Sequence, residues 1–197
     1  HKEILSIKHK SPLSTIYVGG GTPSILNPVQ IKGLIDIFRE NYGINYGAEI
    51  TMEVDPPSFN KDDLYGFINA GINRFSLGVQ SFNNQILKNS GRRHLREDAE
   101  KSCSWLKTVY DSGLIKSWSL DLIQNLPLSG FEQWQNDLKK AITFSPPHIS
   151  IYDLNIENGT VFKKLVDLGK LNLPSDEEAF RNSESTHLIL KNSGYSR

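Results

Sequence analysis

Thr15-Ile-Tyr-Val-Gly-Gly-Gly-Thr-Pro-Ser24 joins an apolar strand to the start of a helix through three adjacent glycines. Glycine accepts the positive φ angles that other residues resist, and it leaves the backbone bare where a ligand lies against it. The stretch lacks the Gly-Lys-Ser/Thr of a phosphate-binding P-loop and the Gly-x-Gly-x-x-Gly of dinucleotide sites. It predicts a ligand near this turn, and the alternative is a merely tight connection between strand and helix.

Beyond this turn, strand-like apolar runs alternate with amphipathic helical patterns. The expected strands are Thr15–Val18, Glu49–Val54, Arg74–Val79, Ser117–Ile123 and His148–Tyr152. Such alternation is typical of a parallel sheet with helices outside it. The chain contains no low-complexity linker, so the whole of residues 1–197 is read as one partial domain.

Helix starts are marked by residues whose side chains cap free backbone N–H groups. The expected starts are Asn27 before Pro28, Asn60 with Asp63, Ser129 with Glu132 and Ser175 with Glu178. The serine pairs have the spacing of a capping box, and proline suits the first helical position. A further helix is expected over Glu97–Tyr110, and Gly194 is expected to stop the last helix.

The two faces of each expected strand differ, because successive side chains of a strand point to opposite faces. One face carries branched apolar side chains such as Ile50 and Leu77, and the other carries Ser, Gly, Thr, Glu, Gln and Asp. A filled barrel, or a parallel sheet covered on both sides, has apolar side chains in these places. The pattern predicts a curved sheet whose polar inner face holds a sizeable polar ligand. The alternative is an open sheet with one solvated face.

Three polar residues stand where such folds bind ligands, near the C-terminal ends of parallel strands. Glu53, Gln80 and Asp121 end, or nearly end, three strands on the polar face, and they suit a ligand with hydroxyls and an amine. Arg92 follows in Ser90-Gly-Arg-Arg-His94, and its guanidinium can hold a carboxylate through two parallel bonds. A lone acidic residue at a strand end more often caps the next helix. Three acceptors beside a glycine turn favour a ligand instead.

The composition is that of an ordinary soluble globular protein, with 38% hydrophobic and 22% charged residues among 197. The 22 Lys and Arg balance the 22 Asp and Glu, which points to neither nucleic acid nor an anionic membrane as a partner. No apolar run approaches the roughly 18 residues of a membrane span. The single cysteine, Cys103, excludes an internal disulfide, and a cytoplasmic location is expected. Both ends look truncated, since the chain begins at His1 and stops just past the last helix.

Four blocks of the sequence, taken together and in order, resemble the radical S-adenosylmethionine proteins related to oxygen-independent coproporphyrinogen III oxidase. The blocks are Tyr17-Val-Gly-Gly-Gly-Thr-Pro-Ser24, Glu49-Ile-Thr-Met-Glu-Val-Asp-Pro56, Asn73-Arg-Phe-Ser-Leu-Gly-Val-Gln-Ser-Phe82 and Ser119-Leu-Asp-Leu-Ile123. The resemblance implies an α/β fold, an incomplete parallel (β/α)6 barrel, which agrees with the polar inner face. It also implies that the polar ligand is S-adenosylmethionine.

The resemblance assigns a role to each candidate residue. Backbone groups of Gly20, Gly21 and Thr22 line the methionine end of the ligand. The acceptors Glu53, Gln80 and Asp121 contact its ribose, amino or adenosine portions, and Arg92 pairs with its carboxylate. Which polar atom each acceptor meets stays open.

Two branches of this group compete: the true oxidase, which decarboxylates propionate side chains of coproporphyrinogen III, and a haem chaperone branch. Gly91-Arg-Arg-His94 and Ser150-Ile-Tyr-Asp-Leu-Asn-Ile-Glu-Asn-Gly-Thr160 resemble blocks of the chaperone branch, which is therefore favoured. That reading implies haem or a porphyrin as ligand, with haem-accepting proteins and an electron donor as partners. Gln124-Asn-Leu-Pro127 departs from the Tyr-Gly-Leu-Pro that is usual in the group.

The resemblance also implies a four-iron four-sulfur cluster, held by three thiolates of a Cys-x-x-x-Cys-x-x-Cys loop after the first strand. This chain has only Cys103, in a helical pattern, where it suits a small core residue. The first strand and the cluster loop are expected before His1. The chain is therefore interpreted as a fragment that carries out no radical chemistry by itself.

No metal site is predicted from the histidines, because no pair has the spacing of ligands on one helix face. The five are His1, His9, His94, His148 and His187. Two other classes of protein stay open. One is a conventional barrel enzyme that binds a phosphorylated metabolite at Gly19–Thr22, and the other is a non-catalytic haem or porphyrin carrier.

Overall fold

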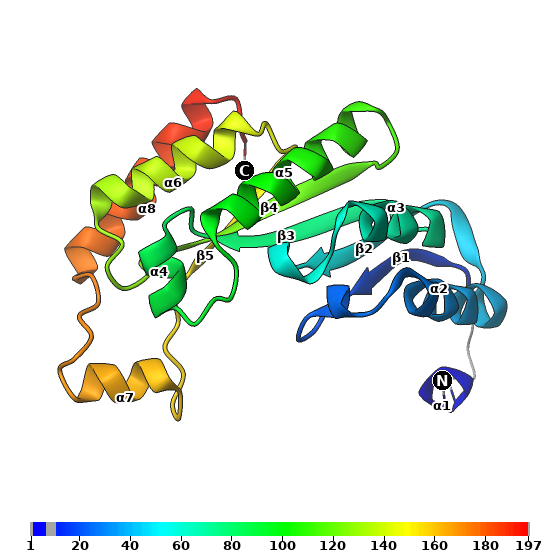
Figure 1. The fold of residues 1–197 in the computed structure, drawn as a ribbon, viewed down its shortest axis with the longest axis horizontal. Coiled ribbons are helices and arrows are strands. Elements are labelled where there is room, and N and C mark those ends of the chain that lie inside the picture. The colour runs from blue at the N-terminus through cyan, green and yellow to red at the C-terminus, as the bar shows by residue number, and fades with distance from the viewer. Residues whose placement is uncertain (1, 7–10, 197) are drawn as a thin grey trace. The chain divides into compact units, whose positions relative to one another are not determined.

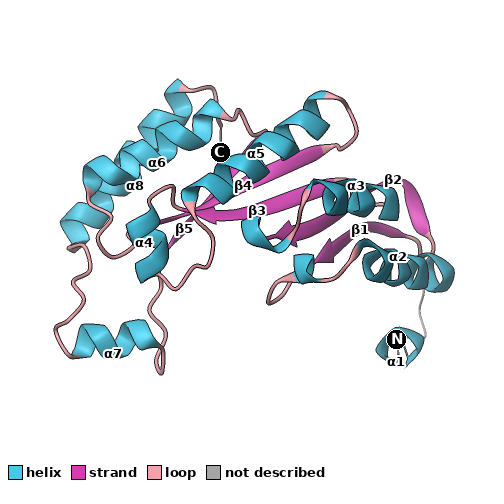
Figure 2. Ribbon diagram, viewed as in Figure 1, coloured by secondary structure: helices cyan, strands magenta, loops and turns pink. Residues whose placement is uncertain are grey.

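A computed structural model describes residues 2–6 and 11–196 of the chain; His1 and His9 lie outside this part (Figure 1). Strands and helices alternate along it (Figure 2). The elements are α1 (Lys2–Ser6), β1 (Leu13–Val18), η1 (Pro23–Ile25), α2 (Pro28–Tyr42), β2 (Ile44–Val54), η2 (Pro56–Ser58), α3 (Lys61–Ala70), β3 (Arg74–Gln80), α4 (Asn84–Asn89), α5 (Arg96–Asp111), β4 (Ser117–Gln124), α6 (Phe131–Thr143), β5 (His148–Asp153), α7 (Val161–Asp167) and α8 (Asp176–Asn192).

The strands form one sheet in the order β1-β2-β3-β4-β5. The pairs β1–β2, β2–β3 and β4–β5 are parallel, as the alternation of strands and helices predicts. The chain divides into two compact units. The first comprises His1–Gly78 with Trp105–Trp118, and the second comprises Val79–Ser104 with Ser119–Arg197.

All five predicted strands are confirmed, and each is longer than predicted at one end. The largest difference is in β2, which begins at Ile44 instead of Glu49. The register against β2 shifts between Leu13 and Thr15, so that an advance of two residues along β1 corresponds to five residues along β2. Gly47, with φ of 78°, allows this irregular backbone, and it also breaks the regular alternation by which a strand is recognised in the sequence.

The predicted difference between strand faces is confirmed in the first unit. Ile16 is only 7% exposed, whereas its neighbour Tyr17 is 60% exposed on the opposite face of β1. The buried side chains of this unit include Ile31 and Ile35 of α2, Ile50, Met52 and Val54 of β2, and Leu64 and Phe67 of α3. Helices α2 and α3 pack against each other. Burying one stripe of each helix is what stabilises such amphipathic elements.

Three predicted helix starts are confirmed as capping boxes. The side chains of Asn27, Asn60 and Ser175 each accept a hydrogen bond from the backbone N–H of the third helical residue. The side chain of that third residue in turn accepts the backbone N–H of the capping residue. The prediction for α6 was wrong by one residue, because Gly130 takes the capping position in place of Ser129. Ser129 is buried, and its N–H donates to the Leu126 oxygen at 2.9 Å, which keeps it in the preceding turn.

The second unit is built around α6 and α8, which pack against each other. Trp134 of α6 is fully buried and donates its indole N–H to Thr186 Oγ1 of α8 at 2.8 Å. Gly194 ends α8 as predicted: with φ of 88° it donates to the Lys191 oxygen, and Tyr195 donates to that of Leu190. Among the described residues, no helix is both long and apolar enough to cross a membrane.

Candidate functional site

The glycine turn after β1 is tied to Glu53, the next-to-last residue of β2. The Glu53 carboxylate accepts the Gly20 N–H at 3.2 Å through Oε2 and the Tyr17 hydroxyl at 2.8 Å through Oε1. Val18, the last residue of β1, pairs in register with Met52, two residues before the end of β2. The structure therefore brings together two of the predicted site residues, Gly20 and Glu53, at the C-terminal edge of the sheet.

Gly19 and Gly20 of this turn are glycines for different physical reasons. A Cβ on Gly19 would lie 2.7 Å from the Tyr17 ring and 3.2 Å from Glu53 Oε1, so only glycine allows these side chains to meet. Gly20 has φ of 121°, which L-residues rarely adopt. Beside Gly20 and Gly21 the space is open, with no atom within 4 Å of a Cβ position. The backbone of Gly20 and Gly21 is therefore bare and accessible to a ligand.

A second set of hydrogen bonds holds the loops after β1 and β2 side by side. Ser24 and Ser58 share a short hydrogen bond, and the Asp55 N–H donates to Ser24 Oγ at 3.1 Å. Ser58 also donates to the Asp55 oxygen at 2.7 Å. The sequence reasoning missed this link and the role of Tyr17. The position of Tyr17 on the polar face, two residues before Gly19, is the signal by which its role could have been found.

Gln80 and Arg92 belong to the second unit. Gln80 ends β3 with φ of 67°, in the left-handed region that non-glycine residues seldom occupy. Arg92 follows α4, and its N–H donates to the Leu87 oxygen at 2.9 Å, which closes the helix end. The Arg92 side chain is exposed and available to an anionic group. His94, in contrast, is 1% exposed and bonds through Nε2 to the Val79 oxygen at 3.0 Å.

Asp121 lies in β4, in register with Ser150 of β5, on the polar face that the alternation predicted. Just beyond it, Asn125 has φ of 63°. This is the position at which the sequence departs from the glycine that is usual in the group, and asparagine is among the few residues that tolerate this backbone. Asn125 donates to Asp153 Oδ1 at 2.6 Å and accepts from Asn182 at 2.8 Å.

Cys103 is a core residue, as predicted. It is fully buried in α5, and burial raises the pKa of its thiol far above the ordinary value. A four-iron four-sulfur cluster needs three thiolates, and the chain has one cysteine. No cluster of three His, Cys, Asp or Glu residues suited to a metal ion exists within residues 2–6 and 11–196. The residues present therefore do not fit such a cluster.

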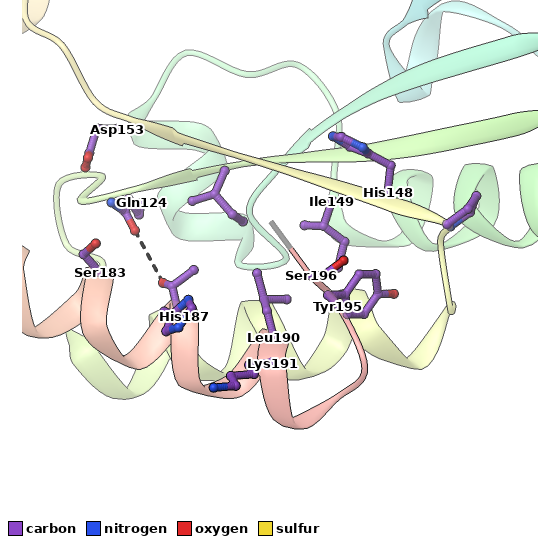
Figure 3. A pocket seen from close by; sticks show the side chains of 13 residues that line it. Gln124, His148, Ile149, Asp153, Ser183, His187, Leu190, Lys191, Tyr195 and Ser196 are labelled. Atoms are coloured by element: carbon purple, nitrogen blue, oxygen red, sulfur yellow. Dashed lines mark hydrogen bonds between the residues drawn. The ribbon is translucent and has the colours of Figure 1, made fainter.

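A pocket of about 780 Å³ lies in the second unit between β5 and α8 (Figure 3). Ile149 points toward Leu190 of α8, and Gln124 accepts the Thr186 hydroxyl at 3.4 Å. None of the predicted site residues lines this pocket.

The order of strands and helices along one sheet, with the glycine turn and Glu53 meeting at the ends of β1 and β2, defines an α/β protein of the incomplete-barrel class. The sequence profile of the Radical SAM superfamily matches residues 1–117. The chain therefore belongs to the radical S-adenosylmethionine superfamily. The predicted fold class is confirmed by a solved structure, coproporphyrinogen III oxidase (HemN) from Escherichia coli, which is 31% identical. It superposes with a TM-score of 0.79 over 93% of this chain and 41% of its own.

The chain is also similar to curated proteins named heme chaperone HemW. The protein from Synechocystis is 40% identical over 179 residues, which is 90% of this chain and 42% of the relative. The protein from Escherichia coli is 37% identical over 184 residues, which is 93% of this chain and 46% of the relative. The chain thus spans less than half the length of these relatives.

Proposed function

We propose that this chain is the S-adenosylmethionine-binding part of a radical S-adenosylmethionine protein that acts as a haem chaperone. The observation that carries the proposal is the 40% identity with a protein named heme chaperone HemW over 90% of the chain. The geometry at the ends of β1 and β2 supports the proposal. The open backbone of Gly20 and Gly21 lies beside the Glu53 carboxylate, which can accept a hydrogen bond from an amine.

In this proposal Gly20, Gly21 and Thr22 line the methionine end of S-adenosylmethionine through backbone groups. Glu53, Gln80 and Asp121 accept hydrogen bonds from its amino and hydroxyl groups, and Arg92 pairs with its carboxylate. Glu53 has a second task in the turn, since it already holds the Gly20 N–H at 3.2 Å. The cluster, and any reaction that depends on it, is not assigned to these residues.

The partners follow from the relatives. We propose haem or a related porphyrin as the cargo, haem-accepting proteins as recipients, an electron donor, and a cytoplasmic setting. The second candidate function is oxygen-independent coproporphyrinogen III oxidase, which removes propionate carboxyl groups to give protoporphyrinogen IX. One observation favours it: the fold matches an enzyme named coproporphyrinogen III oxidase with a TM-score of 0.79.

Binding of S-adenosylmethionine is tested first on the 197-residue chain by isothermal titration calorimetry. Glu53→Gln should weaken binding, since it removes a charged acceptor and loosens Gly20. Glu40→Gln, an exposed carboxylate of α2 in the same unit, is the matched control and should leave the affinity unchanged. Equal affinities for the chain and both variants contradict the placement of the ligand at Glu53.

Haem transfer is tested in a hybrid, because the chain spans less than half of each relative. In the hybrid this chain replaces the matching segment of the Escherichia coli relative, and the cluster is reconstituted. Stoichiometric haem uptake, followed by absorption spectroscopy, with no consumption of coproporphyrinogen III supports the chaperone. Turnover to protoporphyrinogen IX overturns it in favour of the oxidase. A hybrid that binds S-adenosylmethionine but neither takes up haem nor turns over coproporphyrinogen contradicts both.

A further inference from the structure

The turn that ends β3 has an unusual backbone. Gln80 has φ of 67°, and the Ser81 N–H donates to the Val79 oxygen at 2.8 Å, across a single residue. A hydrogen bond from residue i+2 to residue i around a positive φ is a γ-turn of the rare, strained kind. Such strain persists only where the surroundings hold it, and it gathers at ligand sites. The neighbours of this turn therefore decide where the Gln80 side chain points.

A buried carboxylate holds the turn from its downstream side. Asp137 of α6 is 1% exposed. Its Oδ2 accepts the Ser81 hydroxyl at 2.6 Å, and its Oδ1 accepts the Phe82 N–H at 3.1 Å. Gln133 adds a third donor to Oδ1 at 2.9 Å. An aspartate is rarely buried this deeply unless its oxygens are paired. Two of the three donors here come from the two residues that follow Gln80.

A buried histidine holds the same turn from its upstream side. The Val79 oxygen, which accepts the Ser81 N–H, also bonds to His94 Nε2 at 3.0 Å. A carbonyl oxygen only accepts, so Nε2 carries a proton. His94 lies two residues after Arg92, and the segment begins at Gly91 with φ of 72°. The Val79 oxygen thus holds both the turn at Gln80 and, through His94, the segment that carries Arg92.

We propose that Asp137 is a positioning residue of the ligand site: by binding Ser81 and Phe82 it imposes the left-handed turn that directs Gln80 toward the ligand. This inference rests on the proposed function, in which Gln80 contacts S-adenosylmethionine. The competing interpretation is a buried polar group that stabilises the second unit in general. The two differ in one measurable respect. A positioning residue acts through the Gln80 side chain, whereas a general stabiliser does not.

A double-mutant cycle separates these interpretations. The affinity for S-adenosylmethionine is measured by calorimetry in the full chain with Asp137→Asn, with Gln80→Ala and with both. Asp137→Asn keeps the shape of the side chain but removes one of the two acceptor oxygens. Ala141→Gly, a buried position in the same helix, is the control that lowers helix stability without touching the turn.

Asp137→Asn is expected to weaken binding about three- to tenfold when Gln80 is present, the loss of a well-placed hydrogen bond. In the Gln80→Ala background it should change the affinity less than twofold, and Ala141→Gly should leave affinity unchanged. An equal loss in both backgrounds, or no loss in either, overturns the positioning role.

A measurement without ligand separates failure of this inference from failure of the proposed function. In a nuclear magnetic resonance spectrum of the labelled chain, a strong contact between the amide and α protons of Gln80 reports its positive φ. This signal should be present in the chain and lost in Asp137→Asn, with other signals unchanged. Its survival overturns the role of Asp137. If Gln80→Ala leaves the affinity unchanged, the placement of the ligand at Gln80 fails, whatever the spectrum shows.

Discussion

Gly66 and Gly33 offer a matched test of how tightly α2 and α3 pack. Both glycines lie inside helices of the first unit, where replacement by alanine normally adds about 1 kcal/mol to the free energy of unfolding. A Cβ on Gly66 would lie 2.5 Å from Cγ and 2.7 Å from Cβ of Pro28, the first residue of α2. A Cβ on Gly33 would meet nothing within 4 Å.

The magnitude follows from these distances. The Pro28 ring has no rotamer by which to move away, so Gly66→Ala must push α3 from the start of α2. Overpacking of this kind costs typically 1–3 kcal/mol. After subtracting the gain in helix propensity of about 1 kcal/mol, we expect Gly66→Ala to lower the free energy of unfolding by about 1 kcal/mol. Gly33→Ala should raise it by about 1 kcal/mol.

The assay is urea unfolding followed by far-ultraviolet circular dichroism, with both variants and the parent chain measured together. The informative quantity is the gap between the two variants, about 2 kcal/mol, because helix propensity cancels in it. Equal stabilisation by both substitutions would refute the reasoning, since it would mean that Gly66 does not lie against Pro28.

Three further predictions concern the second unit and α5. Burial raises the pKa of Glu100, but its ion pairs with Arg96 and Lys140 outweigh burial and hold that pKa below the ordinary value. Glu100→Gln should therefore lower the free energy of unfolding by about 0.5–1 kcal/mol at pH 7, measured by urea unfolding. This loss should disappear as the pH falls below about 4, where Glu100 becomes protonated. Cys103 should resist a thiol reagent such as iodoacetamide in the native chain and react after denaturation, and rapid native labelling would contradict its burial. Asn125→Ala should lower the free energy of unfolding by about 1 kcal/mol more than Asn125→Gly does. Both variants lose the same hydrogen bonds, but only alanine resists the positive φ at this position. Equal losses of stability would argue against the left-handed backbone.

Much of the fold was predictable because its signals are local. The alternation along Arg74–Val79, with apolar Phe75 and Leu77 facing one side, depends on the two-residue period of a strand. The caps at Asn60 and Ser175 need only a side chain that reaches three residues ahead. The first part of β2 was missed for the same reason, because Gly47 interrupts the period there. Ser129 was mistaken for a cap because the turn that precedes Gly130 depends on backbone angles and not on spacing.

The sequence by itself determined the strands, most helix ends, the polar face and the resemblance to the radical S-adenosylmethionine proteins. Only the tertiary structure decided which groups meet. Glu53 receives the Gly20 N–H from 33 residues away, and Asp137 receives the Ser81 hydroxyl from 56 residues away. The physical reason is that periodicity and capping act within one turn of helix or a few residues of strand, whereas the partner of a buried carboxylate is set by how distant segments pack.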